Sequence, residues 1–332
     1  MASALRRYAV ALARVRARVA RLLGRRQLEA LAEQRDGAIL LRELEVLAVP
    51  RGVAELLAEL DFLLSLVDGP PREVLACYRD RYEVENLKVV LRAVERGLPA
   101  ADALALLLPV GALGSPQTAA SLLAAGSLAA VVEGLPAEPF GDVLRRVLRA
   151  APGPPERFRL EGVAEREAWE RAWRTLADLD ADDRRSAVRV LGTRCDVANL
   201  VRLLRLRVQQ RLAPEELAAL AIRGGYRLGA AERAALVHEE PALWSGRLAH
   251  TPYAPALAAW ADPPAVEREL ARVVGRSAAR ELAGTPFRIG LVLAYVMLLE
   301  IQTSDLRRLQ EGARLARPGE WVAAGLRAER AP

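Results

Sequence analysis

Hydrophobic positions along this chain recur mainly at helical spacing. Two stretches carry the clearest apolar stripes, which comprise Leu87, Val90, Leu91 and Val94 in the first and Leu200, Leu203, Leu204 and Val208 in the second. Steps of three and four residues place each stripe on one face of an α-helix. The helix formers Ala, Leu and Arg are abundant, whereas strand-like alternation of β-branched and aromatic residues is scarce. The pattern predicts an all-α protein.

Both stripes belong to a repeated motif: an acidic residue, then Asn-Leu three positions later, and an arginine that closes the stripe. The two copies comprise Glu83, Asn86 and Arg92, and Asp196, Asn199 and Arg205. The flanks keep the same register of 113 positions, at Leu104 and Leu217, Gly111 and Gly224, and Phe140 and Tyr253. Markers that share one register indicate a duplicated module.

A degenerate third copy lies at 300–309, where Asp305 replaces the asparagine and no arginine closes the stripe. It has fewer residues after it than the earlier copies have, and the N-terminal stretch up to about Leu66 resembles the missing part. We therefore expect three similar helical modules in a closed, pseudo-threefold arrangement. We also expect Asp305 to be tolerated because its copy has lost part of its surroundings.

Segments rich in proline and glycine, which interrupt helices, give the expected domain boundaries. Residues 151–155 read Ala-Pro-Gly-Pro-Pro, which cannot continue a helix and predicts a linker, and Asp262 is followed by two prolines. We expect domains at 1–150, 151–262 and 263–332, the N-terminal helices completing the third.

Asn86 and Asn199 are unusual because asparagine is unfavourable inside a helix and its polar groups need partners when buried. Two interpretations stay open. The side chains form hydrogen bonds that fix how neighbouring segments cross, or they are exposed residues retained through duplication. Neither gives asparagine a catalytic role.

The charge of the chain predicts acidic partners. The net charge is +6 and the pI is near 9.9, which suits nucleic acid, anionic lipid or an acidic protein surface. The first helix is expected at about 4–23, with basic side chains along one face at Arg14, Arg18, Arg21 and Arg25. This face is either solvated or a contact with an acidic partner or lipid headgroups.

A search for chemistry predicts no catalytic, cofactor or metal site. The sequence lacks a Gly-x-x-x-x-Gly-Lys-Ser/Thr loop, and its two histidines, His238 and His250, have no Cys or carboxylate at metal-ligand spacing. Cys77 and Cys195 lie in helical, partly apolar stretches and are expected as small core residues in a reducing compartment. The longest apolar run, 289–299, is shorter than a membrane-spanning helix requires.

The Asn-Leu helices, the segment 286–295 (Pro-Phe-Arg-Ile-Gly-Leu-Val-Leu-Ala-Tyr) followed by Glu300, and the opening 8–18 together resemble the C subunits of bacterial and archaeal V/A-type rotary ATPases. This family is related to the d subunit of the eukaryotic V-ATPase. The resemblance covers nearly the whole chain, and it rests on the order and spacing of the motifs.

The resemblance implies a funnel-shaped, non-catalytic rotor subunit of three similar helical domains on the cytoplasmic face of the membrane. Its expected partners are the central-shaft subunits and the proteolipid ring, and the shaft would plug into the funnel while ATP-linked proton or sodium transport proceeds. No small-molecule substrate and no nucleic acid are expected. The alternative function is a basic helical-repeat adaptor that binds nucleic acid or acidic proteins, although aromatic stacking residues are sparse.

Overall fold

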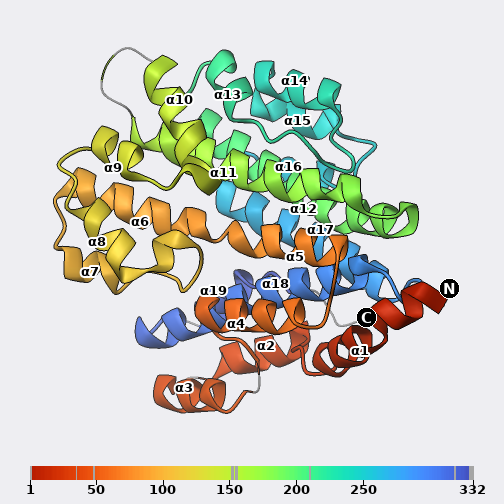
Figure 1. Ribbon diagram of the computed structural model, residues 1–332. Coiled ribbons are helices and arrows are strands. Elements are labelled where there is room, and N and C mark those ends of the chain that lie inside the picture. Colours follow the sequence, from red (N-terminus) through yellow and green to blue (C-terminus); the bar gives the residue numbers. More distant parts are fainter. Residues whose placement is uncertain are drawn as a thin grey trace. The chain divides into compact units, whose positions relative to one another are not determined.

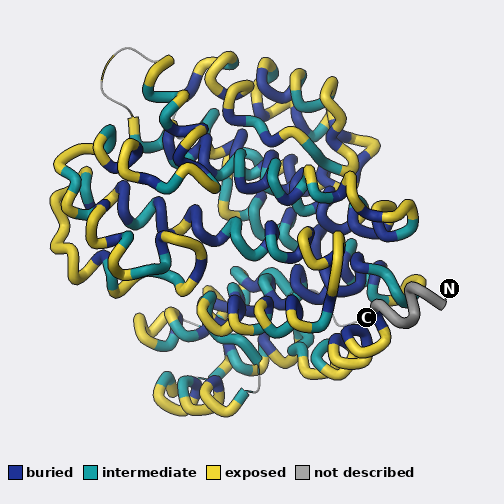
Figure 2. Tube along the Cα trace, viewed as in Figure 1, coloured by how far each residue is buried: buried dark blue, intermediate teal, exposed yellow. Residues whose placement is uncertain are grey.

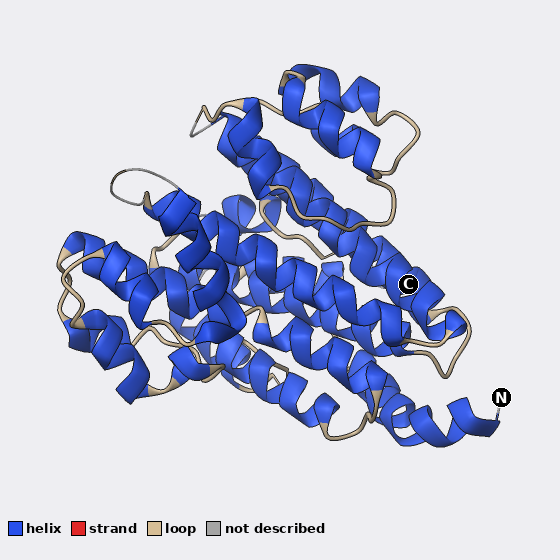
Figure 3. Ribbon diagram, turned by 45° about the horizontal axis from the view of Figure 1, so that its top comes forward, coloured by secondary structure: helices blue, strands red, loops and turns tan. Residues whose placement is uncertain are grey.

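The computed structural model describes residues 2–34, 36–47, 49–150, 153, 156–208, 211–317 and 319–328, with side chains from residue 8 onward. These residues form helices joined by loops, without a strand among them (Figure 3), and the prediction of an all-α protein is confirmed. The α-helices are α1 (Ala2–Val19), α2 (Arg25–Glu33), α3 (Gly37–Glu45), α4 (Val53–Leu64), α5 (Pro70–Asp80), α6 (Glu83–Arg96), α7 (Ala100–Leu104), α8 (Pro116–Leu123), α9 (Leu128–Gly134), α10 (Asp142–Ala150), α11 (Arg157–Arg174), α12 (Ala181–Val208), α13 (Pro214–Leu220), α14 (Ala230–His238), α15 (Pro241–Arg247), α16 (Ala254–Leu257), α17 (Pro263–Leu282), α18 (Ile289–Arg314) and α19 (Gly319–Ala324). Short helical turns are η1 (Ala112–Gly114), η2 (Ala137–Gly141) and η3 (Thr175–Asp178).

Contacts along the chain define two compact units. The first comprises Met1–Pro71, Asp178–Ala218 and Gly224–Pro332, and the second comprises Arg72–Ala177 and Ala219–Arg223. The division into three modules with pseudo-threefold symmetry stays a prediction. The linker predicted at 151–155 lies outside the described residues except for Gly153.

The first unit is built around three long helices, α12, α17 and α18, which pack against one another (Figure 1). Helices α1, α3, α4 and α19 also contact α18, and most of its residues are buried (Figure 2). Among the described helices, α18 alone is long and apolar enough to cross a membrane, but 83% of its most apolar window is buried inside the protein. This burial is typical of a core helix.

A second hydrophobic cluster in this unit joins the two ends of the chain. Leu28 on α2 and Leu40 and Leu44 on α3 pack in one cluster with Leu306, Leu309, Val322 and Leu326. The N-terminal helices therefore share a core with the end of α18 and with α19.

The second unit surrounds α6, which contacts α7, η1, α8, α9 and α11. The predicted stripe residues Leu87, Val90 and Leu91 are fully buried, so the helical period read from the sequence marks the core face. The helix ends at Gly97, whose left-handed φ of 64° caps it as glycine can.

The predicted first helix is too long, because α1 ends at Val19 and Arg25 already belongs to α2. Between them the backbone turns, and the N–H of Leu23 donates to the side chain of Gln302 on α18 at 2.6 Å. A distant hydrogen bond thus replaces the helical bond that the local pattern predicted.

Candidate functional site

The asparagine of the first Asn-Leu helix ties α6 to a loop. Asn86 is fully buried. Its amide nitrogen donates to the carbonyls of Leu108 and Val110 at 2.9 and 3.2 Å, and its amide oxygen accepts from the N–H of Leu108 at 2.7 Å. A single carboxamide therefore satisfies two acceptors and one donor of the loop backbone.

The acidic residue one turn earlier ties down the next part of the same loop. Glu83 accepts from the N–H of Leu113 at 2.9 Å and lies against Gly111, which has φ of 65°. A Cβ at Gly111 would sit 2.0 Å from the carboxyl carbon of Glu83, so the loop needs glycine for both backbone conformation and close approach. Burial raises the pKa of Glu83, and the loop N–H groups only partly offset that effect.

On α12, in the first unit, the acidic residue of the second copy also accepts hydrogen bonds from a loop. Asp196 accepts from the N–H groups of Tyr226 and Arg227 at 3.0 and 2.6 Å and from the hydroxyl of Tyr253 at 2.8 Å. Burial raises the pKa of Asp196 despite these donors, and burial next to that carboxylate raises the pKa of Tyr253. Asn199 is fully buried as well.

The residue predicted as the third copy, on α18, is also buried but faces different backbone groups. Asp305 is 1% exposed and accepts from the N–H groups of Arg327 and Ala328 at 2.8 and 2.7 Å. Asp305 thus faces two backbone donors that suit a carboxylate, and the loss of part of the surroundings of its copy stays a prediction. Asn86 faces two carbonyls and one N–H group, which suit an amide.

The arginines that close the first two stripes pair with glutamates of neighbouring helices. Arg92 on α6 donates to both carboxyl oxygens of Glu161 on α11, at 2.9 and 3.0 Å. In the first unit, Arg205 on α12 donates to both carboxyl oxygens of Glu267 on α17. Each arginine therefore fastens the helix that carries it to a later helix.

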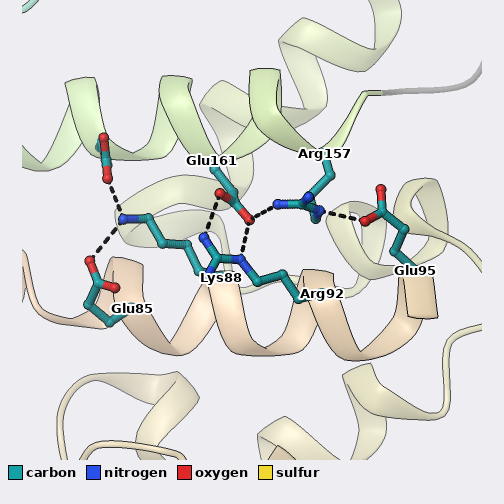
Figure 4. A network of polar contacts seen from close by, with 7 residues as sticks. Glu85, Lys88, Arg92, Glu95, Arg157 and Glu161 are labelled. Carbon is teal, nitrogen blue, oxygen red and sulfur yellow. Dashed lines mark hydrogen bonds and ion pairs between the residues drawn. The ribbon is translucent and has the colours of Figure 1, made fainter. Parts of the chain in front are cut away.

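In the second unit this pair belongs to a ladder of charges between α6 and α11 (Figure 4). Arg157 bridges Glu161 and Glu95 at 2.7 and 2.6 Å, and Lys88 bridges Glu85 at 2.9 Å and Glu165.

The charge states of the ladder follow from burial and pairing. Burial acts to raise the pKa of Glu161, but the hydrogen bonds and charges of Arg92 and Arg157 outweigh it and lower that pKa. Burial likewise acts to lower the pKa of Lys88, and its two glutamates overcome that effect and raise it. The side chain of Arg92 is 47% exposed, so solvent screens its pair with Glu161, and this pair aligns the two helices more than it stabilises them.

The predicted arginine face is divided by the structure. Arg18 pairs with Glu59 at 2.5 Å and stacks over the ring of Phe62, and Arg25 donates to carbonyls at the end of α19. Arg14 and Arg21 are exposed. The partner-contact role of this group stays a prediction, and only its exposed members are available for it.

Sequence analysis missed a lock at the start of α18, formed by the segment 286–290. The N–H of Ile289 and the hydroxyl of Tyr8 both donate to Asp183 on α12, at 2.9 and 2.7 Å. Gly290 lies so close to Ser186 that a Cβ there would meet its hydroxyl at 1.9 Å. The signal was the Pro-Phe-Arg-Ile-Gly segment itself, whose partner in α12 no local pattern reveals.

A small polar hollow lies beside this lock, lined by Asp182, Arg185, Ser186, Arg189, Glu281, Thr285 and Arg288. Its volume of about 170 Å³ is below the roughly 300–1,000 Å³ of ligand pockets. Its arginines already bond to Asp182 and Glu281. We assign no small-molecule site to it. No group of three or more metal-ligating side chains occurs in the part of the chain that the structure describes.

Comparisons with known proteins identify the family. A search of curated proteins finds no match. The family model of the ATP synthase (C/AC39) subunit matches residues 53–320, which is most of the chain and includes all three copies of the motif. This family comprises the C and d subunits of V/A-type ATPases, which are non-catalytic parts of a membrane-associated rotary ATPase. The chain belongs to the ATP synthase (C/AC39) subunit family and is a subunit of a rotary ATPase.

Proposed function

We propose that this chain is the rotor socket that couples the central shaft to the proteolipid ring, without catalysis of its own. It would sit on the cytoplasmic face of the membrane and pass rotation between the shaft and the ring during ATP-linked proton or sodium transport. The observation that carries the proposal is the family match over residues 53–320.

The internal construction of each unit suits a part that transmits torque. Long helices pack along one another, and close-packed interiors transmit strain with little compression. Asn86 and Asp305 hold loops to buried helices, and Arg92 and Arg205 pair neighbouring helices. Bonds of this kind oppose sliding between helices, which a rotor part must resist.

Nucleic-acid binding receives less support. Tyr226 and Trp321 are the two aromatic residues among the large hydrophobic side chains described as exposed. Arg227 lies over the ring of Tyr226 at 4.6 Å, and Arg308 lies over that of Trp321 at 4.1 Å. Single-strand binders need aromatic faces on which bases can stack, and these faces are already covered on one side.

The test is reconstitution of a rotary ATPase purified without this chain. We expect the incomplete complex in lipid vesicles to hydrolyse ATP without pumping ions, and the purified chain to restore pumping and to co-purify with shaft and ring subunits. Buffer without the chain is the control. Equal pumping with and without the chain, or nucleotide turnover by the purified chain itself, would contradict the proposal.

A further inference from the structure

The start of the chain carries positive charge that the fold does not neutralise. The first 28 residues contain eight arginines and no acidic residue. Arg14 and Arg16 are exposed on α1, and Arg21 is exposed in the turn after it. Within the described residues these three guanidinium groups form no ion pair or side-chain hydrogen bond, whereas Arg18 and Arg25 do.

The geometry of α1 places the two groups that it carries, Arg14 and Arg16, at the two edges of its exposed face. Successive residues of a helix are about 100° apart, so Arg16 lies on one flank of the outward face and Arg14 on the other. The positions between them are exposed Ala13 and Ala17. These side chains are short, so the long arginines stand clear of them and can approach a partner's carboxylates in the bidentate geometry that guanidinium favours.

We propose that this basic face, defined as Arg14, Arg16 and Arg21, docks against an acidic protein surface of another subunit of the rotary ATPase. The inference rests on membership of that complex and extends the proposed rotor function by naming a docking face. Charge complementarity carries it: three exposed guanidinium groups within eight residues, none with an ion pair among the described residues, favour a partner that supplies carboxylates.

A lipid surface fits the basic face less well. Helices that lie on membranes insert large apolar side chains, and stable attachment takes more than one signal. Among the side chains of α1 that the structure describes, Tyr8, Leu12 and Val15 are buried in the protein core, Val19 is half-buried, and Val10 is exposed. The face has charge for a membrane but little apolar surface to insert.

The test compares two triple variants of the full chain with the same change in charge. The first combines Arg14→Glu, Arg16→Glu and Arg21→Glu, and the matched control reverses three exposed arginines elsewhere, Arg42→Glu, Arg96→Glu and Arg149→Glu. Thermal unfolding followed by circular dichroism establishes that both variants fold. Partner subunits retained on the tagged chain are then measured at low salt and at about 0.15 M, where exposed charges are partly screened.

We expect the first variant to bind its partner subunits at least about tenfold more weakly than the wild type, and its binding to depend less on salt. The control should bind as the wild type does. Equal retention of both variants would overturn the docking face and leave the rotor function standing. A wild-type chain that retains no rotary ATPase subunit would instead overturn the proposed function, and the docking inference with it.

Vesicle flotation separates the lipid alternative. The probe is vesicles of phosphatidylcholine mixed with phosphatidylglycerol, incubated with the wild type and both variants. We expect no difference among the three proteins. Binding to these vesicles that only the first variant loses, together with unchanged subunit retention, would assign the face to lipid and overturn the proposal.

Discussion

Exchanging an amide for a carboxylate at Asn86, and a carboxylate for an amide at Asp305, tests whether each side chain suits the backbone groups that face it. Asn86→Asp places a buried carboxylate against the carbonyls of Leu108 and Val110, where the amide nitrogen now donates. Asp305→Asn places an amide against the N–H groups of Arg327 and Ala328. Each change alters few atoms and leaves the side-chain shape almost unchanged, so its effect reports hydrogen-bond polarity.

The magnitude for Asn86→Asp follows from its three hydrogen bonds. The bond from the N–H of Leu108 survives, and the carbonyl of Leu108 keeps the N–H of Val110 as a donor at 2.8 Å, whereas the buried carbonyl of Val110 loses the amide that donates to it. Each buried group left without a partner costs about 1–3 kcal/mol, and the buried charge adds to this. We expect a loss of about 3–5 kcal/mol in the free energy of unfolding at neutral pH.

Asp305→Asn should have a smaller effect. An amide can accept from one of the two N–H groups, and its own NH₂ then opposes the other, which costs about 1–3 kcal/mol. Burial raises the pKa of Asp305, so the wild-type carboxylate is itself penalised for being charged. Removing that charge offsets part of the loss, and we expect a net loss of about 1–2 kcal/mol.

The two variants should respond to pH in opposite directions. The carboxyl introduced by Asn86→Asp has a folded-state pKa above its unfolded value, so its destabilisation is full above the folded pKa and shrinks as pH falls through it. Wild-type Asp305 has a raised pKa, so the wild type gains stability as pH falls through that value. Asp305→Asn lacks this gain, and its deficit should grow on acidification.

Urea unfolding of the full chain, followed by circular dichroism between neutral pH and about pH 4, measures both effects. Asp102→Asn on the exposed part of α7 is the charge-matched control for Asp305→Asn and should change stability by less than about 0.5 kcal/mol. Parallel pH trends for the two variants, or a loss below about 1 kcal/mol for Asn86→Asp, would refute the polarity argument.

Three further substitutions test packing and pairing by the same unfolding measurement. Gly111→Ala should cost about 3 kcal/mol or more and Gly97→Ala about 1–2, since both have left-handed φ but only the former would meet a carboxyl group; equal losses would contradict this. Leu203→Ala should cost about 2–5 kcal/mol and Val90→Ala less, because both are fully buried and valine loses fewer atoms. Glu161→Gln should cost about 1–2 kcal/mol and reduce the salt dependence of stability, because it removes the charge that Arg92 and Arg157 share. Unchanged salt dependence would show that these ion pairs do not contribute to stability.

The sequence predicted the fold class and the buried face of the repeated helices because both depend on local periodicity. Leu87 and Leu200, which are 113 positions apart, are each fully buried, as a core stripe requires. The family could also be predicted, since its motifs are contiguous segments. The arrangement of modules involves long-range contacts and stays a prediction.

Which arginines are paired and which are exposed could not be predicted, because the pairing depends on residues far away in the chain. Arg18 and Arg14 lie one turn apart and look equivalent in sequence. Glu59, 41 positions after Arg18, pairs with it and takes it out of the exposed set. In the same way, carbonyls at the end of α19 engage Arg25. Periodicity gives the face of a helix, and only the tertiary fold gives its partners.

Asn86 and Asp305 differ in the backbone groups that face them, which belong to the segment that packs back against each helix. At Asn86 the returning loop presents carbonyls, and at Asp305 the returning segment presents N–H groups. A carboxylate accepts and cannot donate, so it fits only the second arrangement. The carboxylate of Asp305 therefore suits the N–H groups of its own returning segment. In both arrangements a buried helix holds its loop by several directed bonds, and a segment held in this way cannot shift without breaking them together. That coupling is what the proposed transmission of torque requires of each unit.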